Sequence, residues 1–222
     1  MKNISVFDII GPIMVGPSSS HTAGALRIAL VAHKIFKDEI EEVCFTLYGS
    51  FEKTYRGHGT DRALLGGIMG FQTYDERIRD AYEIADKQGI RYSFVPGVMD
   101  VGMHPNTVRI DIKGKHRDLS LVGESIGGGS ILIRQINGIS VKFTGEYTSI
   151  IIQQEDVPGI VSHIASCFTR RNVNIAFMSM FREAAGAKAF TILELDERVS
   201  EEVLEDIRMN PHIEDAFLVD FK

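Results

Sequence analysis

The sequence contains no tryptophan and only two cysteines, Cys44 and Cys167, in 222 residues. Each cysteine has apolar neighbours and the two lie far apart in the chain, which is typical of buried free thiols in a reducing compartment, here the cytoplasm. Two such cysteines also fall short of the thiolate set that an iron–sulfur cluster needs. The sequence therefore predicts free thiols and no metal site built by this chain alone.

A long apolar run and a positive net charge are also missing. No apolar run reaches the roughly 20 residues of a membrane helix, and residues 1–7 show neither a long apolar stretch nor a small-residue cleavage site. We therefore expect no membrane partner and no signal peptide. The 24 basic residues are scattered among 30 acidic ones, with a formal net charge of −6, so nucleic acid is not expected as a partner. A hydrophobic content of 44% fits one large or two small soluble domains.

A hydroxyl-rich stretch stands before the first helical pattern. Residues 16–25 read Gly-Pro-Ser-Ser-Ser-His-Thr-Ala-Gly-Ala, and apolar residues at three- and four-residue steps then predict a helix over about 20–36. Hydroxyls at a helix start accept from free backbone N–H groups, and those N–H groups attract carboxylates. The pattern suits an anion site made by Ser18, Ser19, Ser20 and Thr22 beside the imidazole of His21. An ordinary helix cap that contains a histidine would give the same pattern.

A second histidine stands in residues 55–62, which read Tyr-Arg-Gly-His-Gly-Thr-Asp-Arg. The glycines on either side of His58 leave its ring sterically open to a ligand or to another chain. Thr60 or Asp61 can cap the helix that residues 63–69 suggest. Two histidines, each beside a hydroxyl-rich helix start, indicate one shared site.

The remaining pattern up to about residue 144 predicts a mixed α/β domain. We expect a helix over 75–87 and strands near 43–48, 90–95, 107–112, 119–126, 131–136 and 139–143. Asn-Gly at 137–138 lies between two apolar alternating runs, which predicts a hairpin. The glycines at 127–129 precede a strand, so a bulge or tight bend is favoured over a phosphate loop. His104 and His116 are expected at the surface.

Residues 147–222 change to the order strand, helix, strand, strand, helix, strand, which is typical of a ferredoxin-like βαββαβ domain. The first strand covers 147–153, and Asp-Val-Pro-Gly at 156–159 leads into a helix that begins at Ile160. A hairpin over 175–194, a helix from Ser200 and a closing strand complete the pattern. The fold class expected for the whole chain is α+β, with domains at 1–144 and 147–222.

Residues 16–22 and 57–61 resemble the motifs of the iron–sulfur-dependent L-serine dehydratases of bacteria, and more narrowly the beta chain of their two-chain form. The opening Ser-Val-Phe-Asp-Ile-Ile-Gly-Pro at 5–12 is similar as well. The resemblance implies deamination of L-serine to pyruvate and ammonia. It also implies a partner alpha chain, whose cysteines ligate a 4Fe–4S cluster that binds the serine hydroxyl as a Lewis acid.

The resemblance implies roles for the candidate residues. His58 would act as base or substrate-orienting group, His21 would make polar contacts to substrate or beside the cluster, and Asp61 would orient His58. The hydroxyls of residues 18–22 would hold the substrate carboxylate. Ser125 and Gly127 are further candidates, because the family places this glycine-rich turn close to the helix that carries the serines.

The second half resembles an ACT domain, a small amino-acid-sensing module. The resemblance places an effector at the first helix start and at the next strand entry, where the candidate residues are Val157, Gly159, Ile160, Asn174 and Ile175. A purely structural module that pairs with a second copy through its sheet is the alternative.

Two other functions remain open. Residues 1–144 also resemble the allosteric substrate-binding domain of some phosphoglycerate dehydrogenases, in which case the serine and histidine cluster would bind an anionic regulator. The whole chain would otherwise be a non-catalytic amino-acid sensor, a reading that the ACT-like half and the absence of cluster cysteines favour.

Overall fold

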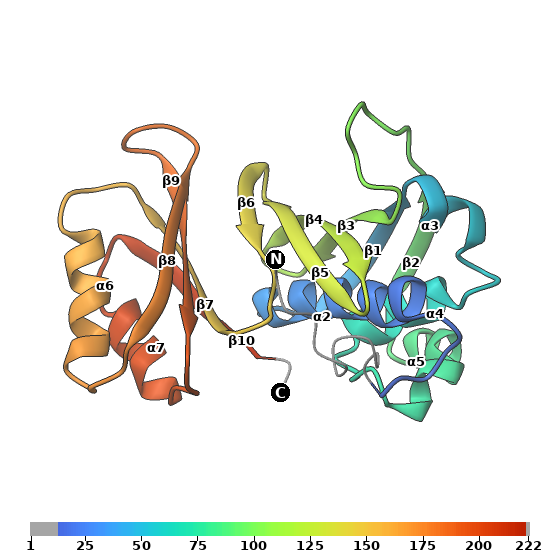
Figure 1. The fold of residues 1–222 in the computed structure, drawn as a ribbon, viewed down its shortest axis with the longest axis horizontal. Helices are drawn as coiled ribbons and strands as arrows, with labels where there is room; N and C mark the ends of the chain where they lie inside the picture. Colours follow the sequence, from blue (N-terminus) through green and yellow to red (C-terminus); the bar gives the residue numbers. More distant parts are fainter. Residues whose placement is uncertain (1–12, 221–222) are drawn as a thin grey trace, which may run out of the picture. The chain divides into compact units, whose positions relative to one another are not determined.

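The computed structural model describes residues 13–220, and the chain divides into two compact units at the boundary between Gly138 and Ile139 (Figure 1). The apolar segment predicted at residues 5–10 lies outside the described residues. The α+β class is confirmed, since each unit combines a largely antiparallel sheet with helices. No helix among residues 13–220 combines the length and the apolar character needed to cross a membrane.

One sheet has the hydrogen-bonded order β2-β1-β3-β4-β5-β6. β1 pairs with β2 in parallel, whereas the β1–β3, β3–β4 and β4–β5 pairs are antiparallel. The predicted strands are all present, although β1 begins three residues earlier than expected. The bounds are β1 Ile40–Leu47, β2 Arg91–Pro96, β3 Thr107–Gly114, β4 Asp118–Gly127, β5 Ser130–Ile136 and β6 Ile139–Phe143.

The helices of the first unit are shorter and more varied than predicted. The expected helix at 20–36 is a π-helical turn, η1 (Ser19–Gly24), that continues as α2 (Ala25–Ile35). The expected helix at 75–87 is a 3₁₀ segment, η2 (Glu76–Asp80), followed by α5 (Ala81–Lys87). A short helix that sequence reasoning missed, α3 (Gly49–Thr54), precedes α4 (Thr60–Ile68).

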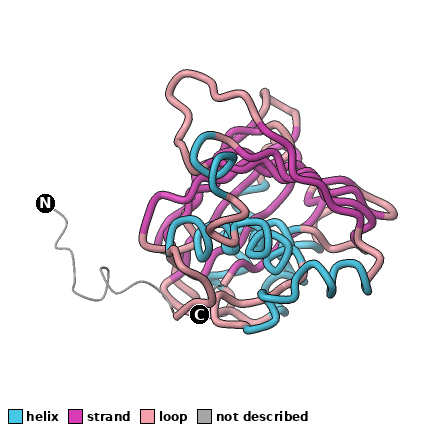
Figure 2. Tube along the Cα trace, turned by 90° about the vertical axis from the view of Figure 1, so that its right-hand side faces the viewer, coloured by secondary structure: helices cyan, strands magenta, loops and turns pink. Residues whose placement is uncertain are grey.

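The core of the first unit lies where α2 packs beside α4 and against β3, β4 and β5 (Figure 1). Figure 2 shows the helices in cyan and the strands in magenta from a second direction. Gly67 makes the close approach of α2 and α4 possible, because a Cβ there would lie 2.6 Å from the Ala29 Cβ and closer still to the Leu26 carbonyl oxygen. On the sheet side of α2, the Ile28 side chain packs over Gly123 of β4, where a Cβ would lie 2.5 Å from Ile28 Cγ2. These contacts fix the direction in which α2 leaves η1.

The second unit contains the predicted βαββαβ order, with a four-stranded antiparallel sheet in the order β10-β7-β9-β8. Both helices pack on the sheet through a shared core, to which the strands contribute alternating Ile and Leu side chains and the helices contribute Ile, Leu, Val and Phe side chains. The strand β8 is at the sheet edge, and its Phe177, Met178 and Met180 are exposed. The bounds are β7 Thr148–Glu155, α6 Ile160–Thr169, β8 Ile175–Arg182, β9 Lys188–Leu195, α7 Glu201–Arg208 and β10 Ile213–Val219.

Candidate functional site

The hydroxyl-rich stretch forms a wide helical turn that begins at Ser18. The backbone of Ser18 is extended, and its hydroxyl accepts from the His21 N–H at 3.1 Å. Its carbonyl accepts from the N–H groups of both Thr22 (2.8 Å) and Ala23 (3.4 Å), and the second of these is the five-residue bond of a π-turn. Such single π-turns are frequent at functional sites because they displace side chains from the regular helical positions.

The His21 ring is held from both of its nitrogens. Nε2 lies 2.8 Å from the hydroxyl of Ser50, at the start of α3, and Nδ1 lies 3.4 Å from the Ser18 hydroxyl. The edge of the ring also contacts Phe51, with centroids 5.5 Å apart. Ser50 was missed because the sequence Gly-Ser at 49–50 was interpreted only as the end of a strand.

The structure brings the two predicted histidines together. The rings of His21 and His58 meet edge to face, with centroids 4.7 Å apart and an interplanar angle of 78°. The Thr22 hydroxyl donates to the His58 carbonyl at 2.9 Å, and this bond ties the loop at 56–59 to η1. His58 Nδ1 is buried and has no hydrogen-bond partner within residues 13–220. A buried ring nitrogen without a partner is costly, and in a functional site it is a position where a proton or ligand can be received.

Asp61 does not orient His58 directly, contrary to the role that the resemblance implied. No hydrogen bond joins the two within the described residues; instead the buried Asp61 carboxylate accepts from the Tyr82 hydroxyl (2.7 Å) and from the Arg62 N–H (2.8 Å). Burial, and then this bond to Asp61, raise the pKa of Tyr82. The residue before α4 is Gly59, in the left-handed region at φ 66°, and neither Thr60 nor Asp61 provides a side-chain cap. Asp61 therefore supports the start of α4 rather than the imidazole.

Ser125 and Gly127 hold different positions relative to the cluster. Ser125 is fully buried, and its hydroxyl donates to the Ser20 carbonyl at 2.8 Å, so it fastens η1 to β4. Gly24 allows this approach, because a Cβ there would lie 2.7 Å from the Ser125 Cβ. Gly127 has φ 108° and is the last residue of β4, where it pairs with Ser130 of β5 across the tight turn at 128–129 that the sequence predicted.

The four predicted carboxylate-binding hydroxyls divide into two pairs. The hydroxyls of Ser18 and Thr22 are used within the chain, for His21 and for His58 respectively. The side chains of Ser19 and Ser20 are partly exposed, and within the described residues their hydroxyls make no hydrogen bond. Carboxylate binding by this set stays a prediction, with Ser19 and Ser20 as its available donors.

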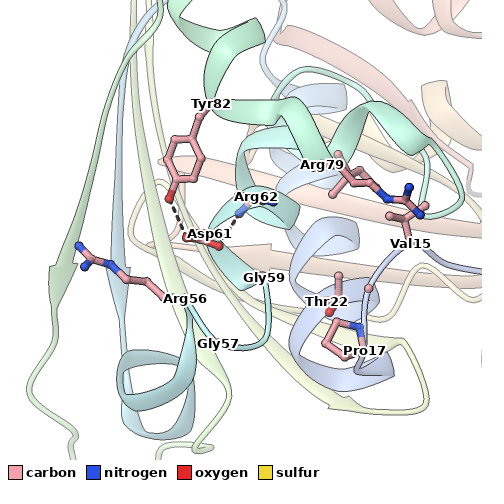
Figure 3. A pocket seen from close by; sticks show the side chains of 12 residues that line it. Val15, Pro17, Thr22, Arg56, Gly57, Gly59, Asp61, Arg62, Arg79 and Tyr82 are labelled. Atoms are coloured by element: carbon pink, nitrogen blue, oxygen red, sulfur yellow. Dashed lines mark hydrogen bonds between the residues drawn. The ribbon is translucent and has the colours of Figure 1, made fainter.

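A cavity of about 840 Å³ is lined in part by Gly57 and Gly59 of the loop that carries His58 (Figure 3). Its walls come from residues 15–17, from the loop and first turn at 56–62, and from Arg79 and Tyr82. Thr22 also lines it, whereas His21 and His58 do not. Sequence reasoning did not identify this cavity, because the residues around it extend from Val15 to Tyr82, which are 67 positions apart in the chain.

The predicted effector residues surround the starts of α6 and β8. They are Val157, Gly159, Ile160, Asn174 and Ile175. Gly159 is left-handed at φ 90°, and the Ile160 side chain is buried in the core of its unit. The turn before α6 is fixed by Asp156, which accepts from Arg182 at 2.8 Å. Effector binding here stays a prediction.

The described residues do not fit an iron–sulfur cluster. No group of three or more His, Cys, Asp or Glu side chains within residues 13–220 is placed to hold a metal ion. Both cysteines are free, Cys44 in β1 and Cys167 in α6. Burial is the main cause of a raised pKa at the Cys167 thiol, which disfavours the thiolate that a metal would bind.

The lowered pKa values of His21 and His33 predict that the folded chain loses stability in mild acid. Burial, and then the charge of His58, lower the pKa of His21 below the ordinary 6.5, and burial chiefly lowers that of His33, although a bond to the Ile68 carbonyl opposes it. The unfolded chain therefore binds these protons more tightly than the folded chain. Stability is complete at neutral pH and is lost as pH falls below about 6.5 towards the folded pKa values.

We expect the urea midpoint to fall between neutral and mildly acidic pH, with a smaller fall in the double variant His21→Gln, His33→Gln. Urea titrations of both proteins over this range provide the measurement. A double variant whose midpoint falls as much as that of the parent would contradict the assignment.

Comparison with known proteins shows which protein families the chain matches. The family model described as serine dehydratase beta chain matches residues 5–135, and the ACT domain model matches residues 148–208. The chain is 42% identical over 214 residues to the probable L-serine dehydratase beta chain of Bacillus subtilis, covering 96% of both chains. It is 40% identical over 202 residues to the L-serine dehydratase beta chain of Peptoniphilus asaccharolyticus, covering 90% of this chain and 91% of that one.

A more limited match extends to another enzyme. The chain is 29% identical over 114 residues to a D-3-phosphoglycerate dehydrogenase of Methanocaldococcus jannaschii, covering 51% of this chain and 22% of that protein. This agrees with the second resemblance noted for the first half. From the full-length matches and the family model, the chain belongs to the serine dehydratase beta chain family and carries an ACT domain in its second half.

Proposed function

We propose that this chain is the beta subunit of a two-chain L-serine dehydratase, in which it supplies the acid–base groups and substrate contacts for converting L-serine to pyruvate and ammonia. The observation that carries the proposal is the His21–His58 pair, with rings 4.7 Å apart, held between η1 and the loop at 56–59. We assign the 4Fe–4S cluster to an alpha chain, because the described residues of this chain offer it no ligand set.

His58 is proposed as the group that takes the α-proton of serine. An imidazole suits this step because its ordinary pKa lies close to neutral pH. Loss of that proton and of the β-hydroxyl leaves an enamine, which tautomerises to an imine, and water then releases ammonia and pyruvate. The unpartnered Nδ1 of His58 supports this role, since no bond within the described chain has to break before that atom receives a proton.

His21 and the neighbouring hydroxyls are proposed to hold the substrate. A lowered pKa keeps the His21 ring neutral at pH 7, so one nitrogen donates and the other accepts. The Ser50 hydroxyl, 2.8 Å from Nε2, is a positioning group that fixes the orientation of this ring. Ser19 and Ser20, at the start of a helix, are proposed to bind the serine carboxylate with hydroxyl and N–H donors.

The second unit is proposed to pair with a second copy and to bind an amino-acid effector. The exposed Phe177, Met178 and Met180 on the edge strand β8 support pairing, because an unprotected apolar edge favours association. Sedimentation velocity of the whole chain measures this: a monomer at all concentrations would exclude pairing.

Reconstitution tests the proposed enzyme function. We expect the chain, mixed under anaerobic conditions with a cysteine-bearing alpha chain encoded beside it, to form a brown, iron-containing complex that produces pyruvate from L-serine. Each chain alone should be inactive, because one lacks cluster ligands and the other lacks the imidazole pair. An iron-loaded complex that makes no pyruvate would overturn the proposal and favour the non-catalytic sensor.

A further inference from the structure

The cavity beside the His58 loop is lined by positively charged side chains, although the chain as a whole is acidic. Three arginines line it, Arg56, Arg62 and Arg79, and none of them forms an ion pair with an acidic residue in the described part of the chain. The whole chain, by contrast, has a formal net charge of −6. Unpaired guanidinium groups gathered around one cavity in an acidic protein indicate an anionic ligand, since a guanidinium binds carboxylates and phosphates through paired donors.

Asp61 is the one acidic residue among the described residues that line this cavity, and it does not cancel the positive charge of the three arginines. Both of its carboxylate oxygens are already used, one by the Tyr82 hydroxyl and the other by the Arg62 N–H (Figure 3). The side chains of Arg62 and Arg79 are exposed and free to turn towards a ligand. With three guanidinium groups and one carboxylate, the formal charge of the lining is +2.

The arrangement of the arginines selects for a ligand with more than one anionic group. Figure 3 shows Arg56 and Arg79 on opposite sides of the lining, with Arg62 and Asp61 between them. A ligand with one carboxylate would bind the arginine on one side of this cavity, whereas a di- or tricarboxylate can bind arginines on both sides.

The cavity is connected to the imidazole pair through Thr22 and through the loop that carries His58. Thr22 lines the cavity, and its hydroxyl donates to the carbonyl of His58. Gly57 and Gly59, on either side of His58, line the cavity as well. A ligand bound there would contact the segment that sets the position of the His58 ring.

We propose that this cavity binds a small organic polyanion of the di- or tricarboxylate class, and that the bound anion regulates the imidazole pair through the loop at 56–59. The regulatory part rests on the proposed function, whereas the binding part does not. Of the predicted substrate contacts at residues 18–22, Thr22 lines this cavity, whereas Ser18, Ser19, Ser20 and the two histidines do not.

Calorimetric titration of the whole chain with tricarballylate tests the binding part without any partner chain. We expect saturable binding that weakens as salt is added, because exposed charges are screened. Arg62→Gln and Arg79→Gln should each weaken it at least about tenfold, through loss of a charge-assisted bond. Arg91→Gln is the matched control, because Arg91 is exposed, lies outside the cavity and pairs with Glu42. It should change the affinity by less than about twofold.

Each outcome decides one part of the proposal. Absence of binding, binding that Arg62→Gln and Arg79→Gln leave intact, or butyrate bound as tightly as tricarballylate would overturn the anion site. If tricarballylate binds but leaves the turnover of the reconstituted enzyme unchanged at saturation, the regulatory part is overturned. An enzyme that never turns over contradicts the proposed function and leaves the calorimetric result standing.

Discussion

Replacing His58 by alanine should reduce turnover of the reconstituted two-chain enzyme by about a thousandfold, within the range that loss of a general base produces. The substitution removes the ring whose buried Nδ1 has no hydrogen-bond partner among residues 13–220 and whose backbone is held by the Thr22 hydroxyl. That bond goes to the His58 backbone carbonyl, so it survives the substitution and the loop should keep its place. The measurement is pyruvate production at saturating L-serine.

The control for this variant is His116→Ala, which removes an exposed histidine of the same unit that contacts Asp38. We expect it to retain turnover close to that of the parent. Iron content and visible absorbance of the complex should be the same in both variants, so that a lost cluster is not mistaken for a lost base. Turnover of His58→Ala within a few-fold of the parent would remove His58 from the mechanism.

Gly67 should be the position in α4 where added volume is least tolerated. A Cβ at this site would meet backbone atoms of Leu26 and Leu30 and lie 2.6 Å from the Ala29 Cβ. Backbone atoms cannot turn away as a side chain can, so α2 and α4 have to separate. Overpacking of this kind costs about 1–3 kcal/mol or more, while the helix preference of alanine returns up to about 1 kcal/mol.

We therefore expect Gly67→Ala to lower the free energy of unfolding by about 2 kcal/mol and Gly67→Val by about 3 kcal/mol. Urea titration at neutral pH measures both. Gly57→Ala is the matched control, because its nearest neighbour would be the Thr54 carbonyl oxygen at an ordinary 3.7 Å. Equal stability of Gly67→Ala and Gly57→Ala would show that α2 and α4 do not approach as closely as described.

The positions of the strands followed from local patterns, whereas the form of the helices did not. Alternating apolar residues predicted β3 and β4 closely, because half-buried strands repeat every two residues. The π-turn at Ser19–Gly24 was not predicted from the sequence, and its Ser20 carbonyl accepts from Ser125 of β4, a partner 105 positions away that no local pattern contains. The split of the helix predicted at 75–87 is a similar case of packing overriding propensity.

The sequence alone was sufficient to predict that His21 and His58 lie together, to predict the strands of the first unit, and to predict the βαββαβ order of the second. These properties are local: a histidine between glycines, hydroxyls at a helix start, and the period of apolar residues are all contained within short stretches of chain. Family motifs are equally local, which explains why the resemblance and the family match agree. The two rings were expected in one site, but no local pattern contained their separation of 4.7 Å.

Only the tertiary structure decided which further residues surround these histidines. The Ser50 hydroxyl contacts the His21 ring from 29 positions away in the chain, and the Tyr82 hydroxyl donates to Asp61 from 21 positions away. Each pairing therefore exists only after the helices have packed on the sheet. The Asp61 carboxylate, which the resemblance assigned to His58, therefore accepts a hydrogen bond from the more distant Tyr82 hydroxyl. The cavity lined by arginines formed in the same way, because it joins segments that share no pattern in the chain and meet only through the packing of α4 and its neighbours.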